Sequence, residues 1–315
     1  MHYTDDDFAT ILLTQHIFDV GVQPLSPAAF WKLCEKVGAP GSLIGLGAND
    51  LARWACASAE EGERLARLLD AMTGVALRLD QLNQSGIQTI AVLNGRLPAL
   101  VDHLRTAAPP LLHVAGDLAL LTARGVGIVG SRHVAEAGRD VSERVAGAAA
   151  ESGFQVISGG ARGVDQAAMK AAVERQGNAV GVLADSLTRQ LRDADTRRLV
   201  GDGTVTLCTP YSPDAPFSVG SAMGRNKLIY AFAHATLVVA TEVDTGGTWA
   251  GAKEALSKNY GRVMVWRGPG EGLGNGALET LGASPVATAE EFLHLAADGV
   301  RSLATANGEQ LGLGL

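Results

Sequence analysis

The chain has 315 residues, of which 47% are hydrophobic and 19% are charged. This composition excludes a disordered or fibrous protein and suffices for about two domains of ~150 residues each. Lys and Arg total 26 against 33 for Asp and Glu, so the formal net charge is −7. An acidic balance argues against a protein that coats duplex DNA nonspecifically, but it leaves room for a local basic pocket.

The sequence predicts no disulfide framework, secretory signal or membrane span. The three cysteines, Cys34, Cys56 and Cys208, form no CxxC pair, and the acidic N-terminus lacks the basic and apolar regions of a signal peptide. The longest apolar run, residues 228–240, is shorter than the ~20 residues that span a bilayer. We therefore expect a reduced, cytoplasmic protein that does not enter a membrane.

Short helices are predicted to dominate residues 1–85, which we expect to form a helical N-terminal domain. Glycines at 38, 41, 45 and 47 separate several of these helices. Residues 86–121 follow as a joining region. The predicted elements are helices over 27–37, 49–59 and 60–79, and strands over 87–93 and 109–116.

Beyond the joining region, short apolar segments rich in β-branched residues alternate with helical patterns. Continuous apolar strands indicate burial on both faces, which is typical of a mainly parallel sheet with helices on each side. We predict a Rossmann-like, doubly wound α/β domain over 122–300 and a flexible tail over 301–315. The predicted strands are 126–129, 155–157, 179–183, 205–207, 236–240 and 262–266, and the predicted helices are 138–151, 164–175, 188–200, 225–234 and 247–258.

The first of these strands carries a glycine motif that we do not interpret as a dinucleotide fingerprint. Residues 125–130, GVGIVG, match GxGxxG, but that motif must follow a strand, whereas here it overlaps one. Gly130-Ser131-Arg132 is better placed, at the carboxyl end of the strand, where open α/β sheets bind ligands. The arginine can bind a phosphate with two hydrogen bonds. A plain turn with a solvated arginine is an equal alternative.

Residues 158–165, SGGARGVD, form the strongest local motif. The segment follows a predicted strand and precedes a predicted helix, and its three glycines let backbone N–H groups approach an anion at the helix N-terminus. Arg162 adds positive charge at the same place. Asp165 falls in the first helical turn, where a carboxylate can either interact with the helix dipole or contact a ligand.

Two further loops extend this edge of the sheet. Residues 224–227, GRNK, are predicted to begin a helix, where two cations oppose the helix dipole and so favour an anionic partner. Residues 244–248, DTGGT, follow the strand 236–240, and four such loops together favour a phosphate-bearing ligand. The candidate phosphate-binding residues are Gly130, Ser131, Arg132, Ser158, Gly159, Gly160, Arg162, Gly163, Arg225, Asn226, Lys227, Gly246, Gly247 and Thr248.

These motifs, in this order, resemble the DNA-processing protein A (DprA/Smf) family, whose pattern is roughly GSR, SGxARGID and RNR. The resemblance covers about residues 8–295 and is specific in the central sheet. It implies a non-catalytic protein that binds single-stranded DNA in a basic pocket at the strand ends. It further implies a homodimer that helps to load the RecA recombinase during recombination or natural transformation. No cofactor or metal is expected.

Departures from the family pattern indicate a divergent member. Met169 stands where the family usually has His, Lys227 ends the RNR-like motif, and residues 245–252 stand in place of SGSLxTA. Many members carry a C-terminal winged-helix domain, but here only residues 289–297 form a helix candidate before the tail. We therefore expect that domain to be absent, and a role outside transformation, such as phage defence, is open.

The alternative is an enzyme or a nucleotide sensor. Gly246-Gly247-Thr248 with Glu254 faintly resembles the PGGxGTxxE signature of the lysine-decarboxylase-like nucleotide phosphoribohydrolases, although Glu254 lies six residues beyond Thr248. About two helical turns, ~10 Å, would separate this carboxylate from a phosphate at the helix N-terminus. We therefore expect no turnover of nucleoside monophosphates, while a sensor that binds a nucleotide without chemistry stays open.

Overall fold

The computed structural model describes residues 3–55, 57–93 and 95–298 and divides into two compact units. The first unit contains Met1–Gly116 with two later segments, Asp185–Gln190 and Cys208–Pro216. The second contains Asp117–Ala184, Leu191–Leu207 and Phe217–Leu315. The domain boundaries at residues 85 and 121 stay predictions, and the predicted tail over 301–315 lies outside the described residues.

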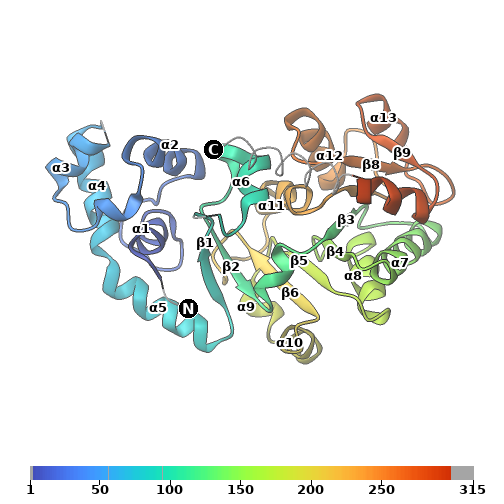
Figure 1. The fold of residues 1–315 in the computed structure, drawn as a ribbon, viewed down its shortest axis with the longest axis horizontal. Coiled ribbons are helices and arrows are strands. Elements are labelled where there is room, and N and C mark those ends of the chain that lie inside the picture. The colour runs from blue at the N-terminus through green and yellow to red at the C-terminus, as the bar shows by residue number, and fades with distance from the viewer. Residues whose placement is uncertain (1–2, 56, 94, 299–315) are drawn as a thin grey trace, which may run out of the picture. The chain divides into compact units, whose positions relative to one another are not determined.

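Helices make up most of the first unit and enclose its own apolar core, which includes Phe30, Leu43 and Leu65. The predicted helix over 60–79 is two helices, because the backbone leaves the helical conformation at Ala71, where φ is −76° and ψ is 12°. The helices are α1 (Asp5–Thr14), α2 (Pro27–Val37), α3 (Ala48–Trp54), α4 (Ala59–Asp70), α5 (Met72–Gln84), α6 (Pro98–Leu104) and α9 (Leu187–Gln190), with 3₁₀ turns at Pro40–Leu43 and Arg105–Ala107 (Figure 1).

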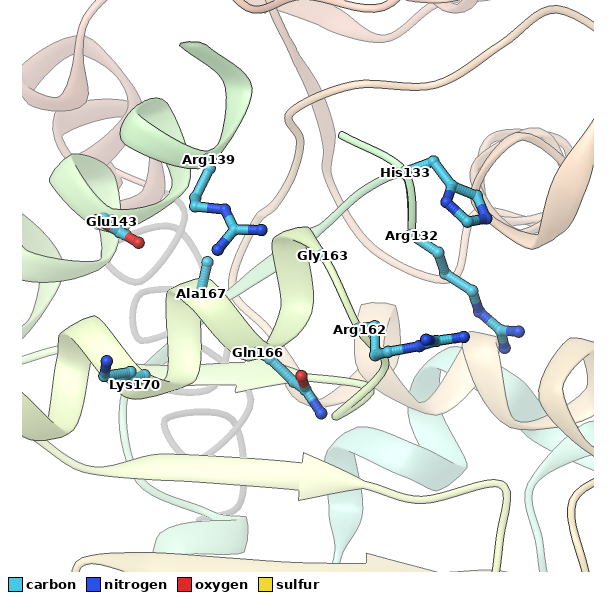
Figure 2. Close-up of a pocket in the computed structure, with 9 residues that line it drawn as sticks. All are labelled: Arg132, His133, Arg139, Glu143, Arg162, Gly163, Gln166, Ala167 and Lys170. Carbon is cyan, nitrogen blue, oxygen red and sulfur yellow. The ribbon is translucent and has the colours of Figure 1, made fainter. Parts of the chain in front are cut away.

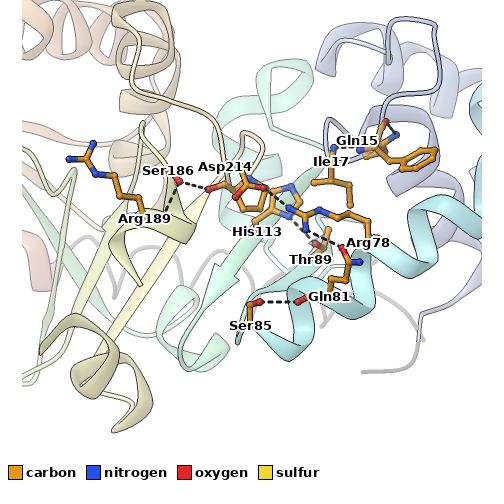
Figure 3. Close-up of polar contacts among 12 residues, drawn as sticks. Gln15, Ile17, Arg78, Gln81, Ser85, Thr89, His113, Ser186, Arg189 and Asp214 are labelled. Atoms are coloured by element: carbon orange, nitrogen blue, oxygen red, sulfur yellow. Dashed lines mark hydrogen bonds and ion pairs between the residues drawn. The ribbon is translucent and has the colours of Figure 1, made fainter. Parts of the chain in front are cut away.

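Two antiparallel strands, β1 (Gln88–Ala91) and β2 (Leu111–Ala115), complete the first unit. The segment Cys208–Pro216 is attached to this unit through polar contacts (Figure 3). Arg78 on α5 forms an ion pair with Asp214, and the hydroxyl of Ser186 donates to the carbonyl oxygen of Pro213 at 3.0 Å. Sequentially distant segments therefore hold each other in place within one unit.

A mainly parallel sheet forms the centre of the second unit and confirms the predicted Rossmann-like α/β class. Its strands lie in the order β6-β5-β4-β3-β7-β8-β9, and β3 is parallel to both β4 and β7. Every position of β3 to β8 is buried, as expected for strands covered on both faces. The strands are β3 (Gly125–Val129), β4 (Gln155–Ser158), β5 (Ala179–Val182), β6 (Val205–Thr209), β7 (Thr236–Val238), β8 (Val263–Trp266) and β9 (Ser284–Val286).

Helices α7 and α8 pack together on β3 and β4, while α11 packs on β3, β4 and β5 with α12 beside it (Figure 1). Val126, Val145 and Leu237 belong to the resulting core. No described helix is long and apolar enough to span a membrane. The helices are α7 (Glu136–Glu151), α8 (Val164–Glu174), α10 (Ala194–Gly201), α11 (Val219–Phe232), α12 (Gly246–Lys258) and α13 (Asn275–Thr280), with a 3₁₀ turn at Leu118–Leu121 and helical residues over 289–298.

Further predicted helices differ from the structure, and the one predicted over 49–59 ends at Trp54. The helix predicted over 188–200 is α9 and α10, with Asp193 capping the second through its contact with the N–H of Thr196. The helix predicted over 225–234 begins earlier, at Val219, because the Ser218 side chain caps it by accepting the N–H of Ser221. The glycines at 220 and 224 hid this earlier start. Residues 224–227 therefore lie inside α11 and do not begin it.

Candidate functional site

The candidate site lies where the winding of the sheet reverses. From β3 the chain continues through β4, β5 and β6 on one side, and it later adds β7 on the other side of β3. In open parallel sheets this reversal leaves a crevice at the carboxyl ends of the two neighbouring strands. The loops after β3 and β7 both line a cavity of about 500 Å³, which we call the strand-edge pocket.

Residues from all four predicted segments line the strand-edge pocket. Residues 245–248, at the start of α12, line the pocket. Asn226 links them to α11, because its side-chain amide donates to the Gly247 carbonyl oxygen at 2.9 Å. Ala161 and Asp165 represent the fourth loop in the lining, although its predicted glycines and Arg162 do not line this pocket. The predicted residues that line it are Gly130, Ser131, Arg132, Arg225, Asn226, Gly246, Gly247 and Thr248.

Glycines allow the loops after β3 and β4 to approach each other closely. A Cβ atom on Gly163 would lie 2.4 Å from the carbonyl oxygen of Ser131, and one on Gly130 would lie 2.5 Å from the first residue of α8. Gly163 also has a φ of 87°, which only glycine adopts at little cost. The close approach brings Arg132 and Arg162, one from each loop, to the same part of the surface.

Inside the strand-edge pocket, a buried cation and a buried carboxyl group share the space beside Gly159. Arg225 and Asp165 are 4% and 5% exposed, and the Gly159 N–H donates to Oδ2 of Asp165 at 3.1 Å. Burial raises the pKa of Asp165 to about 6, while the charge of Arg225 and backbone N–H groups oppose this rise. A Cβ atom on Gly159 would lie 1.8 Å from Nη1 of Arg225, so the guanidinium group occupies the space that a side chain at this position would fill.

One wall of the strand-edge pocket is apolar and open to solvent. Phe217 and Val219 line it with 47% and 73% of their surface exposed, and Met223 lies next to them in the lining. The guanidinium carbon of Arg132 lies 5.0 Å from the centroid of the Phe217 ring, within the range of a cation–π contact. This wall offers an aromatic surface on which a flat ring could stack.

The formal charges of the strand-edge pocket cancel. Its cations are Arg132 and Arg225, and its carboxyl groups are those of Asp165 and Glu242. A pocket with an aromatic wall and no net charge suits a nucleobase better than a row of phosphates, because every base has a face that can stack.

A second cavity, of about 380 Å³, lies between α7 and α8 and has a different charge balance (Figure 2). We call it the helix pocket. Arg139 from α7, Arg162 from the loop before α8, and Lys170 from α8 line it, and Glu143 is its one carboxylate. Arg132 lines both cavities, so the two are adjacent. The helix pocket therefore has four cations against one anion.

The remaining predicted residues serve other contacts. The buried hydroxyl of Ser158 donates to the Ile128 carbonyl oxygen at 2.6 Å and so links β4 to β3. Gly160, with a φ of 67°, turns the chain between β4 and α8. Lys227 lines neither pocket; burial lowers the pKa of its ammonium group, and the negative charge of Glu254 partly opposes this.

The described residues contain no candidate metal cluster, and the carboxylate of the hydrolase-like signature lines neither cavity. In the described ranges, no group of three or more His, Cys, Asp and Glu side chains could hold a metal ion. Glu254 lines neither pocket, and its Oε1 accepts a hydrogen bond from the Tyr260 hydroxyl at 3.5 Å. The carboxyl groups that line the strand-edge pocket are those of Asp165 and Glu242.

Sequence reasoning missed Phe217, Arg139 and Lys170. The two cations lie on exposed helix positions, where basic residues are common and no local pattern distinguishes them. Phe217 stands in the irregular segment before α11, and its signal was an aromatic residue in a loop rich in Pro and Ser. Only the fold shows that this loop reaches the strand-edge pocket.

Comparison with known proteins places the chain among DNA-processing proteins. A family model described as DNA recombination-mediator protein A matches residues 88–297. The putative DNA processing protein DprA of Mycobacterium tuberculosis is 32% identical over 145 residues, and the DNA processing protein DprA of Bacillus subtilis is 29% identical over 102 residues. These matches cover 45% and 32% of this chain, and 36% and 34% of the relatives. The chain thus matches about a third of the length of each relative.

Solved structures share the fold. DNA processing protein A of Streptococcus pneumoniae has a TM-score of 0.69 at 20% identity, covering 93% of this chain and 98% of that one. DNA processing protein A of Helicobacter pylori has a TM-score of 0.53 at 21% identity, covering 66% and 94%, and its description concerns the binding of single-stranded DNA by that protein. Likeness at these identities extends to the architecture of the sheet and its helices.

Proposed function

Because the chain belongs to the DNA recombination-mediator protein A family, we propose that it binds single-stranded DNA at the strand-edge pocket. The observation that carries the proposal is the contact of Arg132 with Phe217 at the reversal of the sheet. Proteins that bind single strands combine cations for the backbone with aromatic surfaces for the bases. The DNA-binding relative from Helicobacter pylori supports the same assignment.

Replacing Arg132 tests this proposal. In Arg132→Ala, the affinity for a fluorescent oligothymidylate should fall about tenfold, and the salt slope of log K should decrease by about 0.7 for each lost phosphate contact. Fluorescence anisotropy at several salt concentrations measures both quantities. Arg198→Ala is the matched control, because Arg198 is an exposed arginine of α10 that lines neither pocket. Equal affinity and slope in the two variants would contradict the proposal.

We further propose, from family membership, that a homodimer of the chain passes the bound strand to a RecA-type recombinase in recombination or DNA uptake. The apolar segment 228–233 is buried inside the second unit and gives the dimer no support. Light scattering should give twice the chain mass of 32.5 kDa. A single-chain mass would contradict the dimer, and unchanged RecA filament assembly on the strand would contradict the transfer.

We propose that the protein binds without catalysis, because the carboxylate of the hydrolase alternative lies outside both cavities. Nucleoside monophosphates should therefore release no ribose 5-phosphate. A nucleotide sensor is the second candidate, since the cavity of about 500 Å³ falls within the usual size of small-ligand pockets. Calorimetry distinguishes a DNA-binding protein from a nucleotide sensor. A mononucleotide that binds more tightly than an oligothymidylate favours the sensor.

A further inference from the structure

We infer that the helix pocket is a second DNA site, which binds the phosphates of the strand whose base occupies the strand-edge pocket. The inference rests on the proposed function and assigns separate parts of the ligand to the two cavities. The strand-edge pocket receives a base against Phe217, and the helix pocket receives the adjoining backbone. Arg139 and Lys170, which no sequence motif includes, become DNA contacts.

The charge balance supports this division. The two cations of the strand-edge pocket face two carboxyl groups, whereas the helix pocket has four cations and one carboxylate. Backbone phosphates carry one charge per nucleotide and so gain most where positive charge is in excess. An anionic chain that leaves the neutral pocket should therefore follow the cations toward α7 and α8.

The cations of the helix pocket are available to a ligand. Arg139 and Arg162 are exposed and, within the described residues, form no ion pair with another side chain. Lys170 pairs with Glu174 at 3.6 Å, but both side chains are more than half exposed, and such a pair contributes little. A phosphate can therefore replace Glu174 as the partner of Lys170.

The position of Arg139 gives a further reason to expect an anion. It lies in the first turn and a half of α7, where the helix dipole is unfavourable to a cation. Arg162 stands directly before the N-cap residue of α8. A phosphate near both would be stabilised by the two guanidinium groups and by the positive ends of the two helices.

The two cavities are continuous through Arg132 and the loop contact beneath it. Arg132 lines both, and Gly163 packs against the backbone of Arg132, with 2.9 Å between its virtual Cβ atom and the Arg132 Cα atom. In Figure 2, Arg162 points toward the side on which Arg132 lies, while Arg139 and Lys170 extend the row of cations along α7 and α8. One strand that passes Arg132 can therefore contact both cavities.

Oligonucleotide length separates the two sites in an experiment. Oligothymidylates of about 4 and about 16 nucleotides span the range of site sizes known for single-strand-binding folds. The double variant R139A/K170Q should bind the longer strand about tenfold more weakly, with a salt slope lower by about 1.4, the sum of two contacts of ~0.7. It should bind the shorter strand with wild-type affinity, because that strand occupies the strand-edge pocket.

A gain-of-affinity variant and a matched control complete the test. Glu143→Gln removes the one carboxylate of the helix pocket and should strengthen binding of the longer strand severalfold. Arg198→Ala should change neither strand. Unchanged affinity of R139A/K170Q for the longer strand, or equal losses on both strands, overturns the inference. Failure of the wild type to bind either strand, or of Arg132→Ala to weaken binding, overturns the proposed function itself.

Discussion

Gly159, Asp165 and Arg225 depend on one another for space and for charge. The absent side chain of Gly159 leaves room for the Arg225 guanidinium, and the Gly159 N–H donates to Asp165. The sequence predicted Gly159 as an anion-binding residue because it lies in a glycine-rich loop. Its buried neighbours, Arg225 and Asp165, show that it also has a packing role. No local pattern could have revealed it, because Arg225 comes from another helix 66 residues along the chain.

Asp165 makes stability depend on pH in a direction opposite to that of most carboxyl groups. An unfolded aspartate titrates near pH ~3.9, whereas burial raises the pKa of Asp165 to about 6 in the folded protein. Stability from its protonated form is therefore complete below the unfolded pKa and is lost as pH rises through about 6. As pH rises through this window, the free energy of unfolding of the wild type should fall by about 3 kcal/mol relative to that of Asp165→Asn.

Urea unfolding of both proteins between pH 4 and pH 8 measures this difference, with about 1.4 kcal/mol expected for each unit of pKa shift. The asparagine variant retains a side chain of similar size but cannot titrate. Parallel curves for the two proteins across this range would show that Asp165 has an ordinary pKa in the folded state.

At the scale of elements, glycine loops determine how closely α8 approaches the loop after β3. Gly163 and Gly153 both have positive φ values, 87° and 73°. A Cβ atom on Gly163 would lie 2.4 Å from the Ser131 carbonyl oxygen, whereas a Cβ atom on Gly153 would have no neighbouring atom within 4 Å. Alanine at Gly153 therefore tests backbone strain alone, whereas alanine at Gly163 also displaces a neighbouring loop.

Gly163→Ala should be the more damaging of the two substitutions. Each alanine meets a positive φ that costs about 1–3 kcal/mol, and Gly163→Ala should lose about 1–3 kcal/mol more because the loops must separate. Only this variant should weaken DNA binding, because Arg132 and Arg162 move apart. Unfolding free energies and oligothymidylate affinities test both points. Equal losses in Gly153→Ala and Gly163→Ala would mean that the loop contact does not matter.

The elements themselves were predictable where one residue pattern determined them. Strands β3 to β8 are buried on both faces, so their continuous apolar segments identified them from the sequence, whereas β9, with two exposed positions, was not predicted. The start of α11 was missed because two glycines interrupt its first turns and the cap at Ser218 has no distinctive sequence. The helix pocket was missed because its cations come from separate helices, and only their packing brings them together.

At the scale of the whole molecule, the chain passes between its two units five times. The segment Cys208–Pro216 belongs to the first unit and leads directly to Phe217, which lines the strand-edge pocket in the second. Arg78 holds this segment through Asp214 (Figure 3). Burial lowers the pKa of the His113 ring to about 3, and the charges of Arg78 and Asp214 act on this pKa in opposite directions. Contacts within the first unit therefore hold the segment that directly precedes Phe217 in the sequence.

Removing Arg78 should loosen this segment without unfolding either unit. The ion pair is partly exposed, with Arg78 30% and Asp214 51% exposed, so its loss should cost under ~1 kcal/mol. Hydrogen exchange of residues 208–216 in Arg78→Ala should accelerate by about two- to fivefold, which corresponds to that energy, while exchange in α7 and α8 stays unchanged. Arg53→Ala is the control, because its pair with Asp50 is exposed and lies within one helix. Equal exchange of residues 208–216 in both variants would show that the segment is held by its backbone contacts alone.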